Sequence, residues 1–248
     1  MKDKPLRLTN VSLSFGAIVV FEHLSLEIEH GEFVAVVGPS GCGKTTLLNL
    51  LSQFLKPTSG AVESAGRLRM VYQHDSLFPW QTVAENIGLG LRHIAEKNRR
   101  RQLEEMLRLV NLKSFAEHYP HQLSGGMRQR VELARALAGD TDILLLDEPF
   151  SSLDYLTRLR MRSELSRILE QFPRTVVLVS HDIEEAAQLA DRILVLSDRP
   201  ARICCEVAVD LKRPRELTHP QVVNTVHRIL AQMGLEREES WAVSAPVS

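Results

Sequence analysis

The chain has 248 residues, of which 44% are hydrophobic, so it can bury the core of one large domain or of two closely joined ones. Its 30 basic and 31 acidic residues leave a net charge of −1, which argues against a dedicated nucleic-acid-binding protein. No apolar run approaches the roughly 18 residues that a membrane-spanning helix needs, and we expect no secretory signal at the N-terminus. Any membrane role would therefore be peripheral, through a partner.

The three cysteines do not suggest a disulfide framework. Their number is odd, and Cys204 and Cys205 are adjacent, so a reducing cytoplasm is the better expectation. Cys42 lies among loop glycines, where it is either a small space-filling residue or a redox switch. The weak reactivity of an unactivated thiol favours the first interpretation.

The predicted elements alternate along the chain. Residues 6–15 and 24–29 alternate apolar and polar side chains, as half-buried antiparallel strands do. Continuous apolar runs, typical of strands in a buried parallel sheet, occupy residues 33–37, 143–146, 175–179 and 193–196. Helical patterns occupy residues 45–54, 126–138, 158–171 and 183–190. This order predicts an α/β fold with a largely parallel core.

Residues 76–125 have a different pattern. Helical periodicity covers residues 82–91 and 97–110, with no strong strand between them, so we expect a helical subdomain inserted between core segments 1–75 and 126–214. The basic run at residues 97–101 is interpreted as a solvated helix face. In the tail, residues 215–248, apolar residues recur at helical spacing, which predicts an amphipathic helix packed on the body or on a neighbouring subunit rather than on lipid.

A phosphate-binding loop follows the buried run at residues 33–37. The motif G-x-x-x-x-G-K-[ST] is matched directly before a predicted helix, which is the setting that it requires. Its glycines would let backbone N–H groups point at phosphate oxygens, Lys44 would face the β- and γ-phosphates, and the Thr45 hydroxyl would ligate Mg²⁺. The predicted nucleotide-binding residues are Gly38, Pro39, Ser40, Gly41, Cys42, Gly43, Lys44, Thr45 and Thr46.

Two acids, Asp147 and Glu148, end the buried run at residues 143–146. Successive strand side chains point to opposite faces, so the two carboxylates cannot share a role. Asp147 would hold the Mg²⁺, and Glu148 would act as general base on the attacking water. A solvated loop is the alternative interpretation of such a pair.

Residues 123–129, Leu-Ser-Gly-Gly-Met-Arg-Gln, resemble the signature sequence of ATP-binding-cassette (ABC) ATPases. A hydroxyl and bare N–H groups at a helix start form a second anion site, and Ser124 would also cap that helix. The resemblance implies a P-loop NTPase with a RecA-like parallel core and an N-terminal antiparallel β subdomain, working as a head-to-tail dimer. Each copy would complete its partner's ATP site with Leu123, Ser124, Gly125, Gly126, Gln129 and Asp154.

The resemblance implies roles for three further residues. Phe15 looks like the aromatic that stacks on adenine, although an ordinary core aromatic is the alternative. Gln73 looks like the glutamine that contacts Mg²⁺ and water and links the core to the helical subdomain. His181 looks like the switch histidine that contacts the γ-phosphate, so the implied catalytic set is Glu148, His181 and Gln73.

Residues 77–83, and residues 148–150 leading into 156–160, resemble the ATPase subunits of bacterial importers for nitrate, sulfonates and taurine, and residues 198–200 and 213–215 agree with that branch. The branch implies no regulatory β-domain after residue 215. Pro79 and Trp80 lie where such subunits meet a permease, so Trp80 is either an interface anchor or a buried loop aromatic.

The predicted function is therefore an ATP-hydrolysing subunit, peripheral on the cytoplasmic face of a bacterial inner membrane, that binds ATP and Mg²⁺. It would dimerise beneath two permease subunits, depend indirectly on a solute-binding protein, and bind no nucleic acid. A soluble cassette ATPase acting on DNA, ribosomes or cluster assembly is the first alternative, against which the near-neutral charge counts. A regulatory module that does not hydrolyse is the second, against which Glu148 and His181 count.

Overall fold

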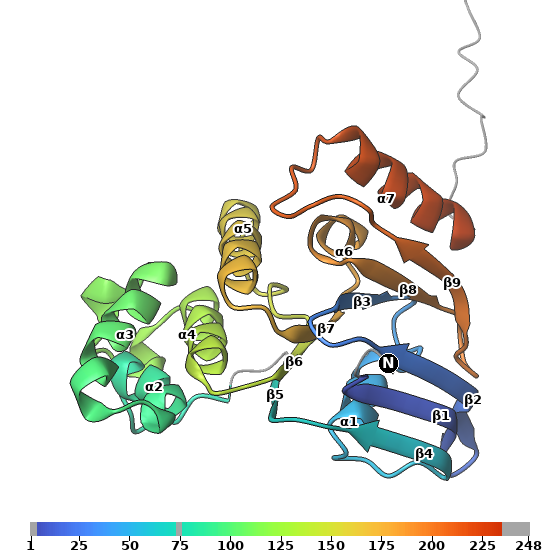
Figure 1. Cartoon of the computed structure of the whole chain (residues 1–248), viewed down its shortest axis with the longest axis horizontal. Coiled ribbons are helices and arrows are strands. Elements are labelled where there is room, and N and C mark those ends of the chain that lie inside the picture. The colour runs from blue at the N-terminus through green and yellow to red at the C-terminus, as the bar shows by residue number, and fades with distance from the viewer. Residues whose placement is uncertain (1–3, 73–75, 235–248) are drawn as a thin grey trace, which may run out of the picture.

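Two β-sheets carry the fold of the computed structural model, which describes residues 4–72 and 76–234 (Figure 1). In these residues the core sheet has six strands, which in spatial order are β5 (Leu68–Val71), β6 (Ile143–Asp147), β7 (Thr175–Val179), β3 (Phe33–Val37), β8 (Arg192–Leu196) and β9 (Ile203–Ala208). The five strands β5, β6, β7, β3 and β8 are mutually parallel, and β9 pairs antiparallel with β8. The predicted largely parallel core is confirmed.

The second sheet is antiparallel, in the order β2 (Ile18–Ile28), β1 (Leu6–Phe15) and β4 (Ser59–Ser64). The prediction for β1 is confirmed, but β2 begins at Ile18 rather than at residue 24. A tight turn joins the two strands, because Phe15 pairs with Ile18. The start of β2 was missed because residues 18–21 are continuously apolar and break the alternation that predicts a half-buried strand.

The core sheet is buried on both faces. Along β3, Val34 and Val36 join one apolar cluster with α1 (Lys44–Leu51) and the antiparallel sheet. Phe33, Ala35 and Val37 join a second cluster with the helices on the other face. This strict alternation follows from the two-residue repeat of a strand, and double burial explains the continuous apolar runs in the sequence. The helices of the second cluster include α4 (Gly125–Ala138), α5 (Tyr155–Gln171), α6 (Ile183–Leu189) and α7 (Pro220–Gln232).

Helices also occupy the stretch that we predicted to be a helical insertion, and they lie together at one end of the molecule (Figure 1). These elements are α2 (Val83–Gly90), α3 (Glu96–Leu109) and short 3₁₀ turns at Leu91–His93, Lys113–Phe115 and Pro120–Gln122. Thr82 begins α2 with a reciprocal capping box, in which its hydroxyl accepts from the Glu85 N–H. The exposed Arg100 and Arg101 of α3 pair with Glu104 and Glu105 one turn later, as expected for a solvated face. The proposed domain limits stay a prediction, because α2, α3 and α4 share one apolar cluster with the core sheet.

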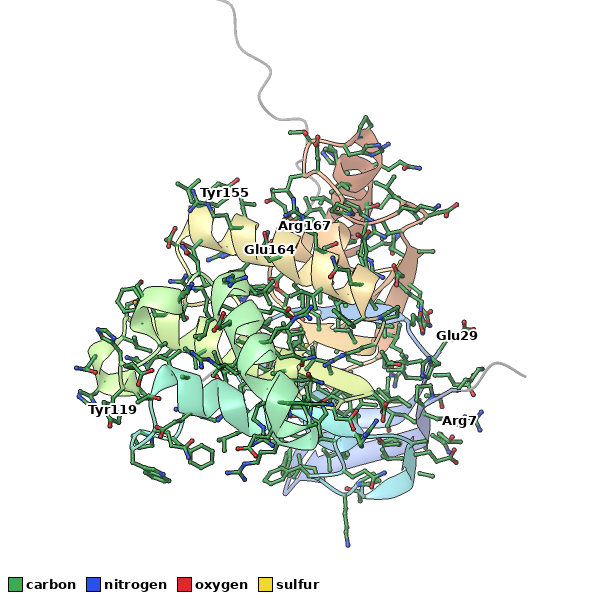
Figure 2. All side chains as sticks on the ribbon, turned by 60° about the vertical axis from the view of Figure 1, so that its left-hand side comes forward. Arg7, Glu29, Tyr119, Tyr155, Glu164 and Arg167 are labelled. Atoms are coloured by element: carbon green, nitrogen blue, oxygen red, sulfur yellow. The ribbon has the colours of Figure 1, made fainter. Side chains whose placement is uncertain are left out.

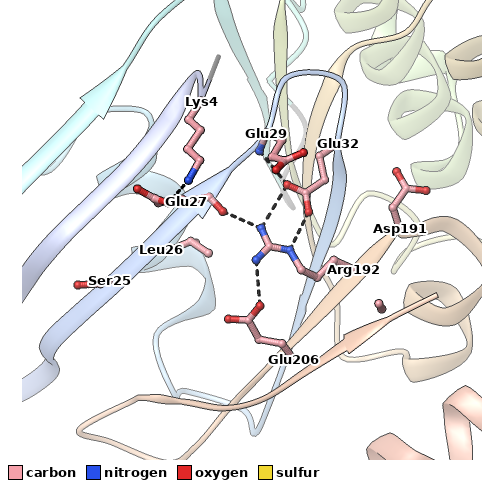
Figure 3. Close-up of a pocket in the computed structure, with 10 residues that line it drawn as sticks. Lys4, Ser25, Leu26, Glu27, Glu29, Glu32, Asp191, Arg192 and Glu206 are labelled. Carbon is pink, nitrogen blue, oxygen red and sulfur yellow. Dashed lines mark hydrogen bonds and ion pairs between the residues drawn. The ribbon is translucent and has the colours of Figure 1, made fainter. Parts of the chain in front are cut away.

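An ion-pair network joins the two sheets (Figure 3). The Arg192 guanidinium lies 2.7 Å from a Glu32 carboxylate oxygen and 2.9 Å from one of Glu206, and it donates to the Glu27 carbonyl at 2.6 Å. A cavity of about 650 Å³ opens beside this network, and no phosphate-loop residue lines it. We therefore interpret the cavity as the seam between the sheets rather than as the functional site.

The tail helix α7 packs on α6 through the buried Val222 and Ile229, which confirms packing on the body. Strand β9 was not predicted from the sequence, because its alternation is short and contains Cys204 and Cys205, which we considered only as thiols. Among residues 4–72 and 76–234, we find no helix with the length and apolar character needed to cross a membrane.

Candidate active site

The phosphate loop is folded tightly between β3 and α1. Gly43 has a φ of 119°, and a β-carbon there would lie 2.7 Å from Val20 Cγ1. Gly41 has a φ of 77°, and a β-carbon on Gly38 would lie 2.9 Å from the Leu196 carbonyl oxygen. Gly43 therefore needs glycine for both its backbone angle and its close approach, Gly41 for its backbone angle, and Gly38 for its close approach.

Lys44 and Thr45, at the start of α1, both form hydrogen bonds within the chain. The buried Lys44 ammonium donates to the carbonyl oxygens of Gly38, at 2.8 Å, and Pro39, at 2.9 Å. The Thr45 hydroxyl lies 3.1 Å from a carboxylate oxygen of Asp147 at the end of β6. The lysine charge is thus held under the loop, and a hydroxyl and a carboxylate are placed together beside it.

A cavity of about 410 Å³ opens over the loop, and we call it the loop pocket. Phe15, at the end of β1, lines it with half of its surface exposed. This position does not fit the core-aromatic alternative. The other lining residues are Val20, Ser40, Gly41, Gly43, Lys44, Thr45, Thr46, Glu148 and Arg199.

Asp147 and Glu148 diverge, as predicted for neighbours at a strand end. Asp147 is buried and reaches Thr45, whereas Glu148 lines the loop pocket. Glu148 has a φ of 47°, in the left-handed region that side chains rarely adopt, and its N–H donates to the Val179 carbonyl at 2.9 Å. Its carboxylate oxygen Oε2 lies 3.1 Å from Nδ1 of His181, which follows β7. The ends of two adjacent parallel strands therefore bring this acid and this histidine together.

The signature residues do not line the loop pocket of their own chain. Ser124 caps α4 and accepts from the Met127 N–H at 3.3 Å, as predicted, while Ser124 and Gly125 are exposed. Leu123 is buried, and Gly126 packs so closely on Leu153 that a β-carbon would lie 2.9 Å from its Cδ2. The start of α4, where we predicted the second anion site, is thus open to solvent and separate from the phosphate loop.

Gln129 is placed differently from its predicted partner-facing role. Its buried side chain donates to the Glu148 carbonyl at 3.3 Å and accepts from the Ser152 hydroxyl at 2.6 Å. Gln129 therefore ties α4 to the loop after Glu148 within its own chain. Asp154, in contrast, is exposed and caps α5 by accepting from the Thr157 N–H at 3.0 Å.

Comparison with known proteins agrees with this geometry. A family model described as "ABC transporter" matches residues 21–151. The chain belongs to the ABC transporter ATPases.

The aliphatic sulfonates import ATP-binding protein SsuB 1 of Agrobacterium fabrum is 43% identical over 227 residues, covering 90% of this chain and 82% of that protein. The taurine import ATP-binding protein TauB of Jannaschia sp. is 40% identical over 213 residues, covering 80% of each chain. A solved dimer of the ATP-binding cassette MJ0796, in a post-hydrolysis state with ADP and Pi, is similar with a TM-score of 0.73 and 33% identity, over 82% of this chain and 98% of that one. The predicted P-loop NTPase fold and ATPase class are confirmed.

Other predicted positions of this ABC ATPase can now be placed. Gln73 lies outside the described residues. Trp80 is 70% exposed, with its ring centroid 5.4 Å from that of Phe78, so it is not a buried loop aromatic. Cys42 is buried, and burial raises the pKa of its thiol, which agrees with a space-filling role.

Arg199 was missed as a site residue. It lines the loop pocket, and its Nε donates to the Gly41 carbonyl. In the sequence it stands 158 residues after Gly41, and it served only as a mark of the importer branch. No local pattern brings these two residues together. They meet because β3 and β8 are adjacent and parallel, so the phosphate loop after β3 and the segment after β8 that carries Arg199 lie at the same edge of the sheet.

Proposed function

We propose that this ABC ATPase is the energising subunit of an importer, in which two copies close on two ATP molecules. The observation that carries the proposal is that, within one chain, the phosphate loop and the signature at the start of α4 are separate. Lys44, Asp147 and Glu148 gather at the phosphate loop, whereas the open helix start at Ser124 and Gly125 lies elsewhere. Two copies arranged head to tail would bring the second anion site onto the first.

Exposed apolar side chains near the signature support such a partner. Tyr155 and Leu156 follow Asp154 directly, and both are exposed. Tyr119 is also exposed, four residues before Leu123. Figure 2 shows Tyr155 and Tyr119 on the side of the molecule away from Arg7 and Glu29. Large apolar groups at one edge favour burial against another protein surface.

The loop pocket suits ATP at three points. Phe15 offers an open aromatic face to adenine, and the loop N–H groups with the start of α1 would hold the phosphates. Lys44 would exchange its loop carbonyls for phosphate oxygens, which are stronger partners because they are charged. Arg199, on the same pocket, would add a second cation.

The residues at the end of β6 fit Mg²⁺. This ion prefers hard oxygen ligands and is usually held by one or two carboxylates together with substrate phosphates. The Thr45 hydroxyl and the Asp147 carboxylate form such a pair, 3.1 Å apart. The described residues hold no cluster of three metal-binding side chains, so the remaining ligands would be phosphate oxygens and water. When bound, the ion neutralises charge on the β- and γ-phosphates.

Hydrolysis would be assigned to Glu148 and His181. Glu148 would orient the attacking water and take its proton, and His181 would hold Glu148 through one ring nitrogen and offer the other to the γ-phosphate. Closure of the dimer around ATP, followed by release after hydrolysis, would then move the attached permeases between two states. The subunit would thus be peripheral, on the cytoplasmic face of the membrane.

The permease would meet the aromatic pair Phe78 and Trp80. Phe78 lines a cavity of about 330 Å³ between β5 and the helices α2 and α4, together with Arg69 and Arg135, and the Trp80 ring lies against Phe78. The Arg135 guanidinium lies over the Phe78 ring, 5.9 Å from its centroid. Exposed aromatics beside arginines are typical anchors of protein interfaces. The names of similar proteins, which include a nitrate import ATP-binding protein, favour an aliphatic sulfonate, taurine or nitrate as the transported solute.

Purification of the tagged chain from solubilised membranes tests this function. Two membrane-spanning permease subunits should co-purify, and their recovery should fall with Trp80→Ala. Phe172→Ala is the matched control, because Phe172 is similarly exposed, at 61%, but lies at the end of α5. Recovery without any membrane partner, bound to nucleic acid or ribosomes, would overturn the proposal in favour of the soluble alternative.

A further inference from the structure

A buried charged network lies directly behind His181. Arg162 of α5 has only 1% of its side chain exposed, and its Nη2 bonds a carboxylate oxygen of Asp182. The same Nη2 lies 3.6 Å from Oε2 of Glu185, which is buried on α6. That Glu185 oxygen also accepts from the Ser180 hydroxyl at 2.6 Å. Charges buried this deeply require such partners, because an unpaired one would carry the full cost of desolvation.

This network holds both neighbours of His181. The Asp182 N–H donates to the Ser180 hydroxyl at 3.0 Å, and Asp182 Oδ1 accepts from the Glu185 N–H, also at 3.0 Å. His181 itself is more than half exposed and meets Glu148. Hydrogen bonds among Ser180, Asp182 and Glu185 therefore fix the backbone on either side of the histidine. That backbone sets the distance between His181 and Glu148.

Arg158 extends the network to a second loop. It stands one turn before Arg162 on the same face of α5. Its Nη1 lies 3.5 Å from Asp182 Oδ2, and its Nη2 donates to the Leu153 carbonyl at 3.1 Å. The rigid, planar guanidinium thus spans the loop at residues 151–154 and the loop that carries His181.

The charges favour this arrangement. Burial opposes the ionised form of Asp182, but the Glu185 N–H and the Arg162 charge outweigh it, so the pKa of Asp182 is lowered. Asp182 therefore stays ionised as the common acceptor of both arginines. Arg158 is 27% exposed, so its side chain has room to move. Arg162 is 1% exposed, and moving it would leave the carboxylates that it contacts without their buried partner.

We propose that Arg158 is a positioning residue that couples the loop at residues 151–154 to His181, with Arg162 and Glu185 as its fixed base. The inference rests on the proposed dimer, because that loop would contact the partner subunit. A partner that shifts the Leu153 carbonyl moves Arg158 and Asp182, and so changes how His181 meets Glu148. Hydrolysis thereby depends on whether the second copy is in place.

The test separates ATP binding from turnover in Arg158→Ala. The fold should survive, because Asp182 keeps Arg162 as its partner. We expect the ATP dissociation constant and the melting temperature to stay near those of the unchanged chain, while kcat falls roughly 10- to 100-fold, which corresponds to about 1.4–2.7 kcal/mol. Arg158→Lys should recover only part of the rate, because an ammonium is a compact point charge and cannot replace the two-pronged fork. Arg160→Ala, an exposed arginine on the same helix, is the control and should keep full activity.

Dimer formation is measured separately in the Glu148→Gln background by size-exclusion chromatography with MgATP. Adding Arg158→Ala should leave the ATP-bound dimer intact. A kcat for Arg158→Ala equal to that of Arg160→Ala overturns the inference alone, as does a parallel loss of ATP affinity or melting temperature. If Glu148→Gln itself forms no ATP-dependent dimer, the proposed function fails and the inference fails with it.

Discussion

His181 Nδ1 lies 3.1 Å from Glu148 Oε2, although the two residues are 33 positions apart in the sequence. The two side chains meet because β6 and β7 are adjacent and parallel, so their carboxyl ends share one edge of the core sheet. The positive φ of Glu148 turns its carboxylate away from Asp147, which instead reaches Thr45. Asp147 thus lies with Thr45, where we propose that Mg²⁺ binds, and Glu148 lies with His181.

Glu148→Gln should bind ATP but lose hydrolysis roughly 10²–10⁴-fold, the range typical of a lost general acid–base group. The amide keeps the shape of the side chain but cannot take a proton from water. Steady-state phosphate release measures the effect, with Glu164→Gln, a partly exposed glutamate on α5 that does not line the loop pocket, as control. Near-normal turnover in Glu148→Gln would remove Glu148 from its assigned role.

Lys44→Ala should weaken ATP binding by roughly 10- to 150-fold, since a hydrogen bond to a charged group contributes about 1.5–3 kcal/mol. The lysine is already poised under the loop through the Gly38 and Pro39 carbonyls. Equilibrium titration with a fluorescent ATP analogue gives the dissociation constant, and the exposed Lys56→Ala serves as control. Unchanged affinity in Lys44→Ala would contradict a phosphate contact.

Phe15→Ala should weaken ATP binding by roughly 5- to 150-fold, because stacking on a base contributes about 1–3 kcal/mol. Phe15→Tyr keeps the aromatic face and should bind nearly as well. Inorganic triphosphate, which lacks the base, should bind all three proteins equally. An unchanged ATP affinity in Phe15→Ala would contradict stacking of Phe15 on adenine.

Much of the fold could be predicted from the sequence, because the doubly buried strands are continuous apolar runs and the phosphate loop is a local motif. Strand β4 could not, since it is an exposed edge strand with few apolar residues. Strand β5 was also missed, being four residues long with a charged second position. Short and exposed strands owe their existence to pairing partners that are distant in sequence.

The same distinction between local motifs and distant contacts applies to the candidate site. Residues within a motif were predicted with their neighbours, whereas Arg199 and the pair Arg162–Glu185 belong to the site only through tertiary contacts. For Gln129, in contrast, the motif predicted the wrong environment. Its motif predicted a role toward a partner, but the structure buries it against Glu148 and Ser152. A motif gives residue identities in order, and the packing of α4 decides which of them face outward.

Glu185 should make stability depend on pH. Burial raises its pKa to about 7 from an ordinary 4.5, even though Arg162 opposes the shift and Asp182 and Arg158 also act on it. Between these values the folded protein binds a proton that the unfolded chain has lost, so stability falls as pH rises through this window and is constant above it. The lowered pKa of Asp182 acts below 3.8, outside the window.

Urea unfolding of the unchanged chain and of Glu185→Gln, from pH 5 to pH 8, measures this contribution. The unchanged chain should gain up to about 3 kcal/mol relative to the variant as the pH is lowered, following 1.36 kcal/mol for each pKa unit. A difference between the two proteins that stays constant, or that grows in the opposite direction, would contradict the assignment.

Ser124→Ala should lose turnover roughly 10²–10³-fold, the effect of removing one preorganised donor to a reacting phosphate. The monomer should still bind ATP, because Ser124 does not line its own loop pocket. The lost helix cap costs about 1 kcal/mol of stability, which a melting curve records. Ser124→Thr keeps both the hydroxyl and the cap, and should restore most of the rate.

The shared site is tested most directly by mixing the Ser124→Ala and Glu148→Gln chains before MgATP is added. In a head-to-tail dimer, one of the two sites in each mixed pair combines an intact Glu148 with an intact Ser124. The mixture should therefore hydrolyse ATP faster than the sum of the two variants measured alone. Mixing Glu148→Gln with a chain that carries both substitutions forms no intact site and should recover nothing. A rate for the first mixture equal to the sum of its components would show that each chain works with its own signature, and would contradict the proposed dimer.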